Sequence, residues 1–242
     1  MVASPLDSGP LIYAHRGDRS RAPDNTLEAY LLAIEAGADG VELDVRRTLD
    51  GILILHHEDH DPLVGTFAST TSHDLRDAAP QIPTLREALD AIPSNVFINV
   101  EIKNNKRQAG FDEERLIVDQ VAEIRAHDDP ARILLSSFDS LAMRRAGEVA
   151  PEFLRGQLIV NPVTLDVGIG LAQKFGMDGI HPELSYLRDG PDVLTQALQG
   201  TTLRTVVWGV NSPEAVAILT EAGVNAIITD DPGMAREVVG QR

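Results

Sequence analysis

The sequence repeats one pattern eight times, a short apolar run followed by a longer segment with helical periodicity. The apolar runs predict strands at residues 11–15, 40–45, 96–102, 132–138, 154–160, 178–184, 205–210 and 225–230. The intervening segments predict helices at residues 26–36, 84–92, 112–126, 140–150, 164–175, 191–199, 213–222 and 233–239. Because strands and helices alternate in this way in α/β proteins with a parallel sheet, eight units within 242 residues predict a (β/α)8 TIM barrel.

A doubly wound open sheet is the alternative to this barrel. Such sheets commonly hold a phosphate group with a G-x-G-x-x-G loop after the first strand, whereas Gly17 stands alone here. No low-complexity or linker-like stretch divides the chain, so one domain over residues 1–242 is expected. The extra piece is residues 46–83, between the second strand and its helix, which we expect to form a lid or an edge.

Charge and composition narrow the class of protein further. The chain carries 21 Lys and Arg against 37 Asp and Glu, a net charge of −16, which argues against a nucleic-acid-binding protein with a basic face. It has no cysteine, so disulfides and thiolate metal sites are excluded. No apolar stretch approaches the ~20 residues that span a bilayer, and the first ten residues lack the pattern of a signal peptide. We therefore expect a cytoplasmic protein without stable membrane association.

Acidic side chains stand where a barrel interior would normally be apolar. Glu42 and Asp44 share one face of the second predicted strand, and Glu101 and Lys103 share one face of the third. Burying three carboxylates together is costly unless positive charge accompanies them. Lys103 could supply that charge as a simple ion-pair partner. A divalent cation is the other interpretation, and ligands that are all carboxylate oxygens favour Mg2+ or Ca2+ over zinc.

Histidines end two of the apolar runs. His15 ends the first predicted strand, and His57 ends the run that follows the turn at residues 50–51. Two imidazoles that titrate near neutrality can act as general base and general acid in one displacement. Arg16 follows His15, and its guanidinium can donate two hydrogen bonds to a phosphate group. His181 lies in the sixth predicted strand, where it could reach the barrel mouth or fill a structural position.

Longer motifs resemble those of a known family. The run AHRGDRSRAPDNTLEAYLLAIEAGADGVELDVRRTLDGILILHHED, residues 14–59, resembles the signature of the glycerophosphodiester phosphodiesterases. The resemblance continues in IPTLREAL, NVEIK, SSFD, WGVN and GVNAIITDDP, so it covers nearly the whole chain in the expected order. It implies a barrel that holds a divalent cation, two catalytic histidines and two phosphate-binding cations. These are Glu42, Asp44 and Glu101 for the metal, His15 and His57 for catalysis, and Arg16 and Lys103 for phosphate.

The resemblance also implies a reaction. The substrate would be a small-molecule glycerophosphodiester, hydrolysed to sn-glycerol 3-phosphate and an alcohol. Its own glycerol 2-hydroxyl would attack phosphorus, the two histidines would transfer protons, and water would open the resulting cyclic phosphate. Two positions depart from the family pattern, because Asp24 replaces a glutamate and Glu58 replaces the aspartate after the second histidine. The longer Glu58 side chain puts the orientation of His57 in doubt. Asn25 and Thr26 are expected to close the first loop onto its helix.

Three other functions compete with this one. A metal-dependent amidohydrolase on the same barrel would use several histidine ligands, but no H-x-H motif follows the first strand. A barrel that binds phosphodiesters without cleaving them would be expected to lack a histidine or an acid of the set, and none is missing. A lysophospholipase D-like enzyme would favour an apolar lip, and residues 58–83 offer only Leu63, Val64 and Phe67. Water-soluble head groups are therefore the expected substrates.

Overall fold

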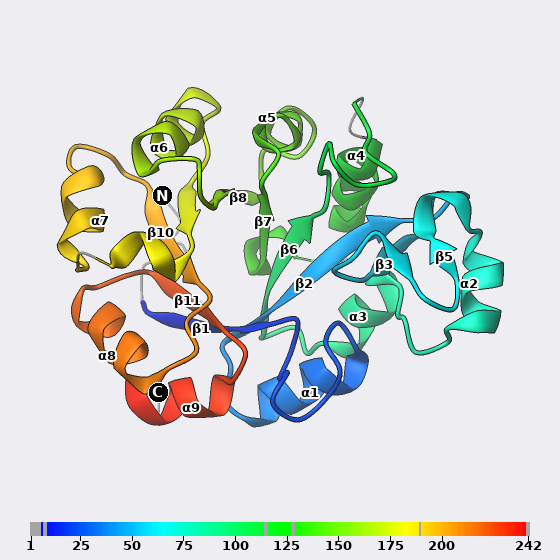
Figure 1. Ribbon diagram of the computed structural model, residues 1–242, viewed down its shortest axis with the longest axis horizontal. Coiled ribbons are helices and arrows are strands. Elements are labelled where there is room, and N and C mark those ends of the chain that lie inside the picture. The colour runs from blue at the N-terminus through cyan, green and yellow to red at the C-terminus, as the bar shows by residue number, and fades with distance from the viewer. Residues whose placement is uncertain (1–5, 7–8, 114–115, 127–128, 189, 241–242) are drawn as a thin grey trace.

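The strands close into a barrel (Figure 1). The structure, a computed structural model, describes residues 6, 9–113, 116–126, 129–188 and 190–240. Within these ranges eight parallel strands follow one another around the ring: β1 (Leu11–His15), β2 (Gly40–Arg47), β6 (Phe97–Ile102), β7 (Ile133–Ser137), β8 (Leu154–Ile159), β9 (Gly179–Pro182), β10 (Arg204–Trp208) and β11 (Ala226–Thr229). The first strand pairs with both β2 and β11, which closes the ring. The predicted (β/α)8 barrel is confirmed, and the open sheet is excluded.

Helices surround the ring, and each follows one of its strands in the chain. They are α1 (Leu27–Glu35), α3 (Leu85–Ala91), α4 (Leu116–Glu123), α5 (Ser140–Val149), α6 (Leu165–Lys174), α7 (Asp192–Ala197), α8 (Pro213–Glu221) and α9 (Pro232–Val239). Side chains cap the first turns of three of these helices, Thr26 for α1, Asp139 for α5 and Ser212 for α8. The segment predicted at 112–126 contains the shorter α4, and residues 114–115 lie outside the described residues. No helix within the described ranges combines the length and apolarity needed to cross a membrane.

Side chains along each strand point alternately outward and inward, which gives the barrel an apolar outer face and an interior of mixed polarity. Val41, Leu43 and Val45 of β2 point outward and pack in a buried cluster with residues of the surrounding helices. The inward positions of the lower barrel are also apolar, and Tyr13 and Val206 belong to a cluster there. Polar inward side chains appear higher up, toward the carboxyl ends of the strands. The sequence thus places its unusual polar residues at the mouth, where barrel enzymes have their sites.

Residues 46–83 extend the barrel wall sideways, as Figure 1 shows beside β2. The second strand runs two residues further than predicted, because its end pairs with the antiparallel strand β3 (Leu53–Leu55). A hairpin of β4 (His60–Asp61) and β5 (Gly65–Thr66) follows, and then α2 (Ser72–Ala78). Phe67, one of the three apolar residues that this segment offered for a lip, is buried in a cluster with residues of α2. Leu63 is exposed.

Candidate active site at the barrel mouth

Three carboxylates from two adjacent strands meet inside the mouth. Glu42 and Asp44 lie on β2, and Glu101 lies on β6 directly opposite Asp44 in the strand register. All three side chains are buried, and each offers an oxygen within 4.8 Å of the others. The shared strand face predicted from the sequence therefore brings the three acids together. A cluster of this kind, with oxygen ligands only, suits a hard divalent cation.

Two cations partly neutralise this cluster. The Lys103 ammonium lies 2.8 Å from Asp44 Oδ1 and 2.5 Å from Glu101 Oε1, while Arg16 Nε lies 3.0 Å from Asp44 Oδ2. The ion pairs that were the alternative to a metal are thus present. Three carboxylates and two cations still leave one negative charge in excess. The ion pairs and a divalent cation are therefore compatible interpretations of the same site.

Glu42 is the carboxyl group that the two cations compensate least. Burial raises the pKa of Glu42 well above its usual value, and the neighbouring Asp44 and Glu101 charges raise it further. For Asp44, burial also acts to raise the pKa, but Lys103 and Arg16 outweigh it and lower the pKa below the usual range. Glu42 Oε1 is buried and accepts no hydrogen bond within the described structure. An unpaired buried carboxylate oxygen is what a bound cation would satisfy.

The first strand ends at His15-Arg16-Gly17 for a geometric reason. Arg16 adopts a left-handed backbone conformation with φ of 59°, which turns its amide toward the site, where it donates to Glu42 Oε2 at 3.0 Å. Gly17 has φ of 89°, and a Cβ there would lie 2.6 Å from the Ala29 backbone. The turn therefore directs both the Arg16 amide and its side chain toward the acids.

Asn25 has a larger role than closing the first loop. Its amide Nδ2 donates to Asp44 Oδ2 at 2.8 Å, and its Oδ1 accepts from the Asp44 amide at 3.1 Å and from the Tyr30 hydroxyl at 3.0 Å. Asn25 also has a left-handed backbone, with φ of 54°. The side chain thereby fixes the orientation of Asp44. No pattern in the sequence indicates this contact across 19 residues, apart from the presence of an asparagine in a turn.

His15 is oriented by the opposite end of the chain. Its Nδ1 lies 2.6 Å from Asp230 Oδ1, at the end of β11. Arg19 donates to the same carboxylate at 2.8 Å, and Asn211 donates to its other oxygen at 2.9 Å. Burial acts to raise the pKa of Asp230, but the hydrogen bonds from His15 and Arg19 lower it to about 2. Asp230 was not predicted as a site residue, although it lies in the TDDP motif that ends the eighth strand.

His57 lies beyond β3, on the segment that extends the barrel wall. Its Nδ1 lies 2.7 Å from Glu58 Oε1, so the replacement of aspartate by glutamate still leaves a carboxylate on this ring nitrogen. The Arg46 guanidinium donates to the His57 backbone carbonyl, which fixes the loop. Burial lowers the pKa of His57, and the Lys103 charge adds to this. The imidazole is therefore held largely neutral near pH 7.

His181 is a structural histidine of the barrel interior. It is fully buried, and neither ring nitrogen has a hydrogen-bond partner within the described structure. A Cβ on Gly156 would lie 2.0 Å from His181 Nε2, so the ring fills the space that this glycine leaves. Burial lowers the pKa of His181 to about 3. The possibility that it reaches the mouth as an acid or base is not supported.

A pocket of about 120 Å3 gathers the predicted site residues. Its lining includes six of the seven, namely His15, Arg16, Glu42, His57, Glu101 and Lys103, and Asp44 lies directly behind them against Lys103. Apolar side chains of Phe138 and Trp208 form part of the opposite wall. In both catalytic candidates Nδ1 meets a carboxylate, which orients the ring and leaves Nε2 for proton transfer.

Fold and site together define the class of this protein, a (β/α)8-barrel hydrolase with its polar groups at the carboxyl ends of the strands. Residues 15–234 match the model of the glycerophosphoryl diester phosphodiesterase family, which is most of the chain. The chain belongs to this family. The resemblance seen in the sequence is confirmed, as is the expectation of an enzyme, a phosphoric diester hydrolase.

Individual relatives agree with the family match. A glycerophosphodiester phosphodiesterase of Caldanaerobacter subterraneus is 31% identical over 92% of this chain and 94% of the relative. A crystal structure of the Thermotoga maritima glycerophosphodiester phosphodiesterase is 26% identical, with a TM-score of 0.79 over 95% of this chain and 98% of that one. An Oleispira antarctica phosphodiesterase, solved in complex with the product sn-glycerol-3-phosphate, is 24% identical, with a TM-score of 0.84 over 98% and 99% of the two chains. At that identity it supports the fold.

Proposed function

We propose that this protein hydrolyses glycerophosphodiesters to sn-glycerol 3-phosphate and an alcohol. One observation carries the proposal: His15 and His57, each with a carboxylate on Nδ1, line the same small pocket as Glu42 and Glu101. Two oriented imidazoles and a carboxylate cluster are the groups that transfer protons and bind a cation in phosphoryl chemistry. The family of the chain supplies the substrate class.

Glu42, Asp44 and Glu101 would hold a divalent cation, Mg2+ or Ca2+. The fit rests on the clustered oxygens, on the unpaired Glu42 Oε1 and on the one negative charge that Lys103 and Arg16 leave uncompensated. When bound, such an ion supplies charge stabilisation for the phosphate and positions an attacking hydroxyl. The cluster with the ion would carry one positive charge, which matches the single negative charge of a phosphodiester.

Proton transfer would fall to the two histidines. One imidazole would take the proton of the glycerol 2-hydroxyl as its oxygen attacks phosphorus, and the other would protonate the departing alcohol oxygen. The bond from phosphorus to that alcohol breaks and a cyclic phosphate forms. Water would then open the ring by the reverse proton transfers, giving sn-glycerol 3-phosphate. Because attack by a tethered hydroxyl is intramolecular, it can lower the barrier by several kcal/mol, of the ~7–11 kcal/mol available to ideal intramolecular reactions.

Arg16 and Lys103 would bind the phosphate group. Both side chains line the pocket, and both are largely buried, at 13% and 10% exposure. Their charges already meet carboxylates, so a phosphate oxygen would share rather than replace those partners. Removal of either cation would therefore disturb both the substrate and the carboxylate cluster.

The test is release of sn-glycerol 3-phosphate from glycerophosphodiesters with choline, ethanolamine, inositol and glycerol head groups. Each assay is run with Mg2+, Ca2+ or Mn2+ and in excess chelator. Activity with a metal and its loss in chelator are expected, whereas full activity in chelator would contradict the cation site. A substrate analogue without the 2-hydroxyl should act as a competitive inhibitor without turnover. Normal cleavage of this analogue would show that water attacks phosphorus directly.

A further inference from the structure

A second, larger pocket adjoins the candidate active site. Its volume is about 810 Å3, and it lies over the carboxyl ends of β6 and β7. It shares His57, Glu101, Lys103 and Phe138 with the inner pocket, so the two open into each other. The inner pocket, at about 120 Å3, suits a small group such as glycerol. The larger pocket is the space available to the alcohol on the other side of the phosphorus.

Unpaired positive charge surrounds this outer pocket. Lys106 and Arg107 lie in the loop after β6, and Lys174 ends α6 across the pocket from them. None of the three makes an ion pair with a carboxylate of the described residues. Of the two acids in the lining, Glu101 pairs with Lys103, while Asp139 accepts from the neutral Asn104 amide at 2.8 Å and keeps one negative charge against the three cations. The chain as a whole has a net charge of −16, so this positively charged surface has the opposite sign to the rest of the protein.

Two aromatic rings near this pocket face cations of the chain itself, whereas Phe138, which lines the pocket, packs edge-on against the Trp208 ring. The Lys174 ammonium lies 5.4 Å from the centre of the Phe175 ring, and the Lys106 ammonium lies 5.9 Å from that of Phe111. A quaternary ammonium group is recognised by open aromatic faces. Here it would meet an ammonium group at each of these rings. The surroundings of Phe111 and Phe175 therefore disfavour a cationic alcohol such as choline.

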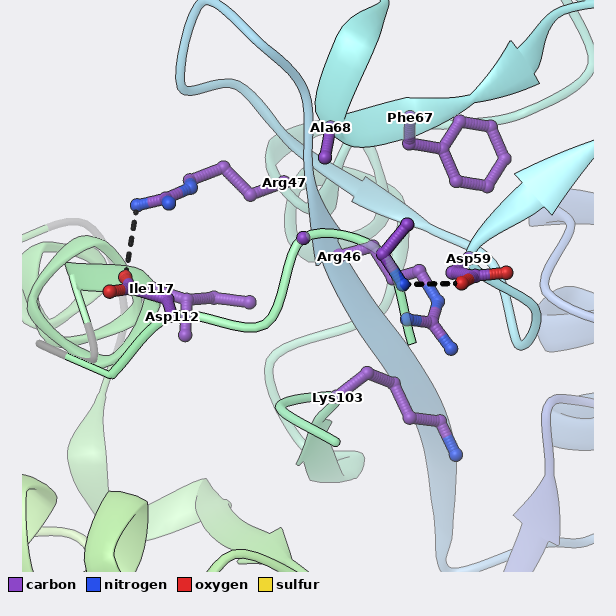
Figure 2. A pocket seen from close by; sticks show the side chains of 10 residues that line it. Arg46, Arg47, Asp59, Phe67, Ala68, Lys103, Asp112 and Ile117 are labelled. Atoms are coloured by element: carbon purple, nitrogen blue, oxygen red, sulfur yellow. Dashed lines mark hydrogen bonds and ion pairs between the residues drawn. The ribbon is translucent and has the colours of Figure 1, made fainter. Parts of the chain in front are cut away.

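The loop that carries Lys106 and Arg107 is fixed at both sides. Figure 2 shows it crossing above Arg46, where the Ala109 amide donates to Asp59 Oδ2 at 2.8 Å. Gln108 Oε1 accepts from Arg46 at 3.1 Å. At the start of the loop the buried Asn104 exchanges hydrogen bonds with the backbone of Asp112. The position of the two cations beside the pocket is therefore built into the fold.

We infer that the preferred substrates carry a phosphate group on the leaving alcohol, which Lys106, Arg107 and Lys174 bind. This inference rests on the proposed function and names its substrate class. A polyol phosphate is the alcohol that fits the positive charge of this pocket. Electrostatic attraction of this kind acts on substrate binding more than on the chemical step, so the preference lies mainly in KM. It weakens as salt screens the charges.

The experiment compares three substrates: glycerophosphoglycerol, its terminal phosphate monoester, and glycerophosphocholine. We expect kcat/KM to be highest for the phosphate-bearing substrate, by roughly 10-fold or more over glycerophosphocholine at low salt. In the double variant Lys106→Gln/Arg107→Gln the preference should fall roughly 5- to 10-fold, and in Lys174→Gln roughly 3-fold. The matched control is Arg86→Gln/Arg144→Gln, which removes two exposed charges that pair with Asp90 and Glu148 away from the pocket. It should keep the wild-type preference.

The outcomes separate this inference from the proposed function. Equal rates on the three substrates, or a preference unchanged in the loop variant, would overturn the inference and leave the phosphodiesterase activity standing. Hydrolysis of none of them would count against the proposed function.

The outer pocket is then tested by calorimetric binding of myo-inositol 1-phosphate. Binding that is lost in Lys106→Gln/Arg107→Gln and kept in the control supports the pocket, and absence of binding to the wild type overturns it.

Discussion

His15 and His57 line one pocket, but they are held in different ways. His15 is the last residue of a barrel strand, and its partner Asp230 lies 215 residues away at the end of the neighbouring strand. That carboxylate is itself held by Arg19 and Asn211. His57 lies outside the ring, and its partner is the next residue, Glu58, whose side chain is 55% exposed. One imidazole is thus oriented by the closure of the barrel and the other by a local contact.

The comparison indicates where the site tolerates change. A carboxylate that accepts hydrogen bonds from two further donors keeps one orientation, whereas an exposed carboxylate can rotate and accept hydrogen bonds from water instead. Of the two departures from the family pattern, Glu58 contacts His57, and Asp24 forms an ion pair with Arg16, beside His15, at 3.1 Å. The difference predicts that removal of either imidazole lowers kcat by a similar factor. Removal of the Asp230 carboxylate should lower kcat more than removal of the Glu58 carboxylate.

The largest expected effect is removal of either imidazole. His15→Ala and His57→Ala should each lower kcat by roughly 100-fold or more, the usual scale of positioned acid-base catalysis. Steady-state rates on a glycerophosphodiester measure this, and circular dichroism checks that the barrel remains folded. If one variant kept near wild-type turnover, only the other histidine would be catalytic, and the comparison of two catalytic histidines would no longer apply.

The buried His181 produces the next effect, on stability rather than on rate. The unfolded chain binds a proton at this residue with a pKa near 6.5, and the folded chain only near 3. The unfolded state therefore binds more protons between these values, so stability is full above pH 6.5 and falls as the pH decreases. The loss should reach about 2 kcal/mol between pH 7 and pH 5.

Denaturant unfolding of the wild type and of His181→Leu at both pH values isolates this contribution. The variant should show a loss smaller by about 2 kcal/mol, whatever its absolute stability. Equal losses in the two proteins would mean that the ring is hydrated and titrates normally. The measurement also separates acid unfolding from protonation of the catalytic pair in any pH profile of activity.

Sequence periodicity was sufficient to predict the fold, because each strand and helix has its own local pattern. Eight repeats of strand and helix also leave few arrangements of the sheet other than a closed barrel. It was also sufficient to bring Glu42, Asp44 and Glu101 together, since strand alternation and adjacency are local rules. The partners Asn25 and Asp230 were not predicted. Their contacts depend on backbone turns and on which strand ends become neighbours when the ring closes, and neither is visible in a local window of sequence.

Asp230→Asn tests the contribution of the carboxylate that orients His15. The amide cannot accept from Nδ1–H and from Arg19 with the full charge, so the His15 ring loses its fixed orientation. We expect kcat to fall roughly 10-fold, with a smaller change in KM. Asp231→Asn is the matched control, because Asp231 caps α9 and asparagine caps equally well. A loss of the same size in both variants would indicate a structural role for this turn instead.

Glu58→Gln tests the locally held side and should have the smallest effect. The carboxylate is exposed, its hydrogen bond of 2.7 Å to His57 spans adjacent residues, and hydrogen bonds with exposed charged partners contribute at most about 1 kcal/mol. We therefore expect kcat to fall roughly 3-fold or less. The backbone of His57 would stay in place, because Arg46 donates to its carbonyl regardless of residue 58. Glu58→Asp, which restores the usual family residue, should be at least as active as the wild type. If Glu58→Gln lost as much activity as Asp230→Asn, the two carboxylates would be equivalent orienting groups, and the distinction between barrel-held and locally held histidines would have no functional consequence.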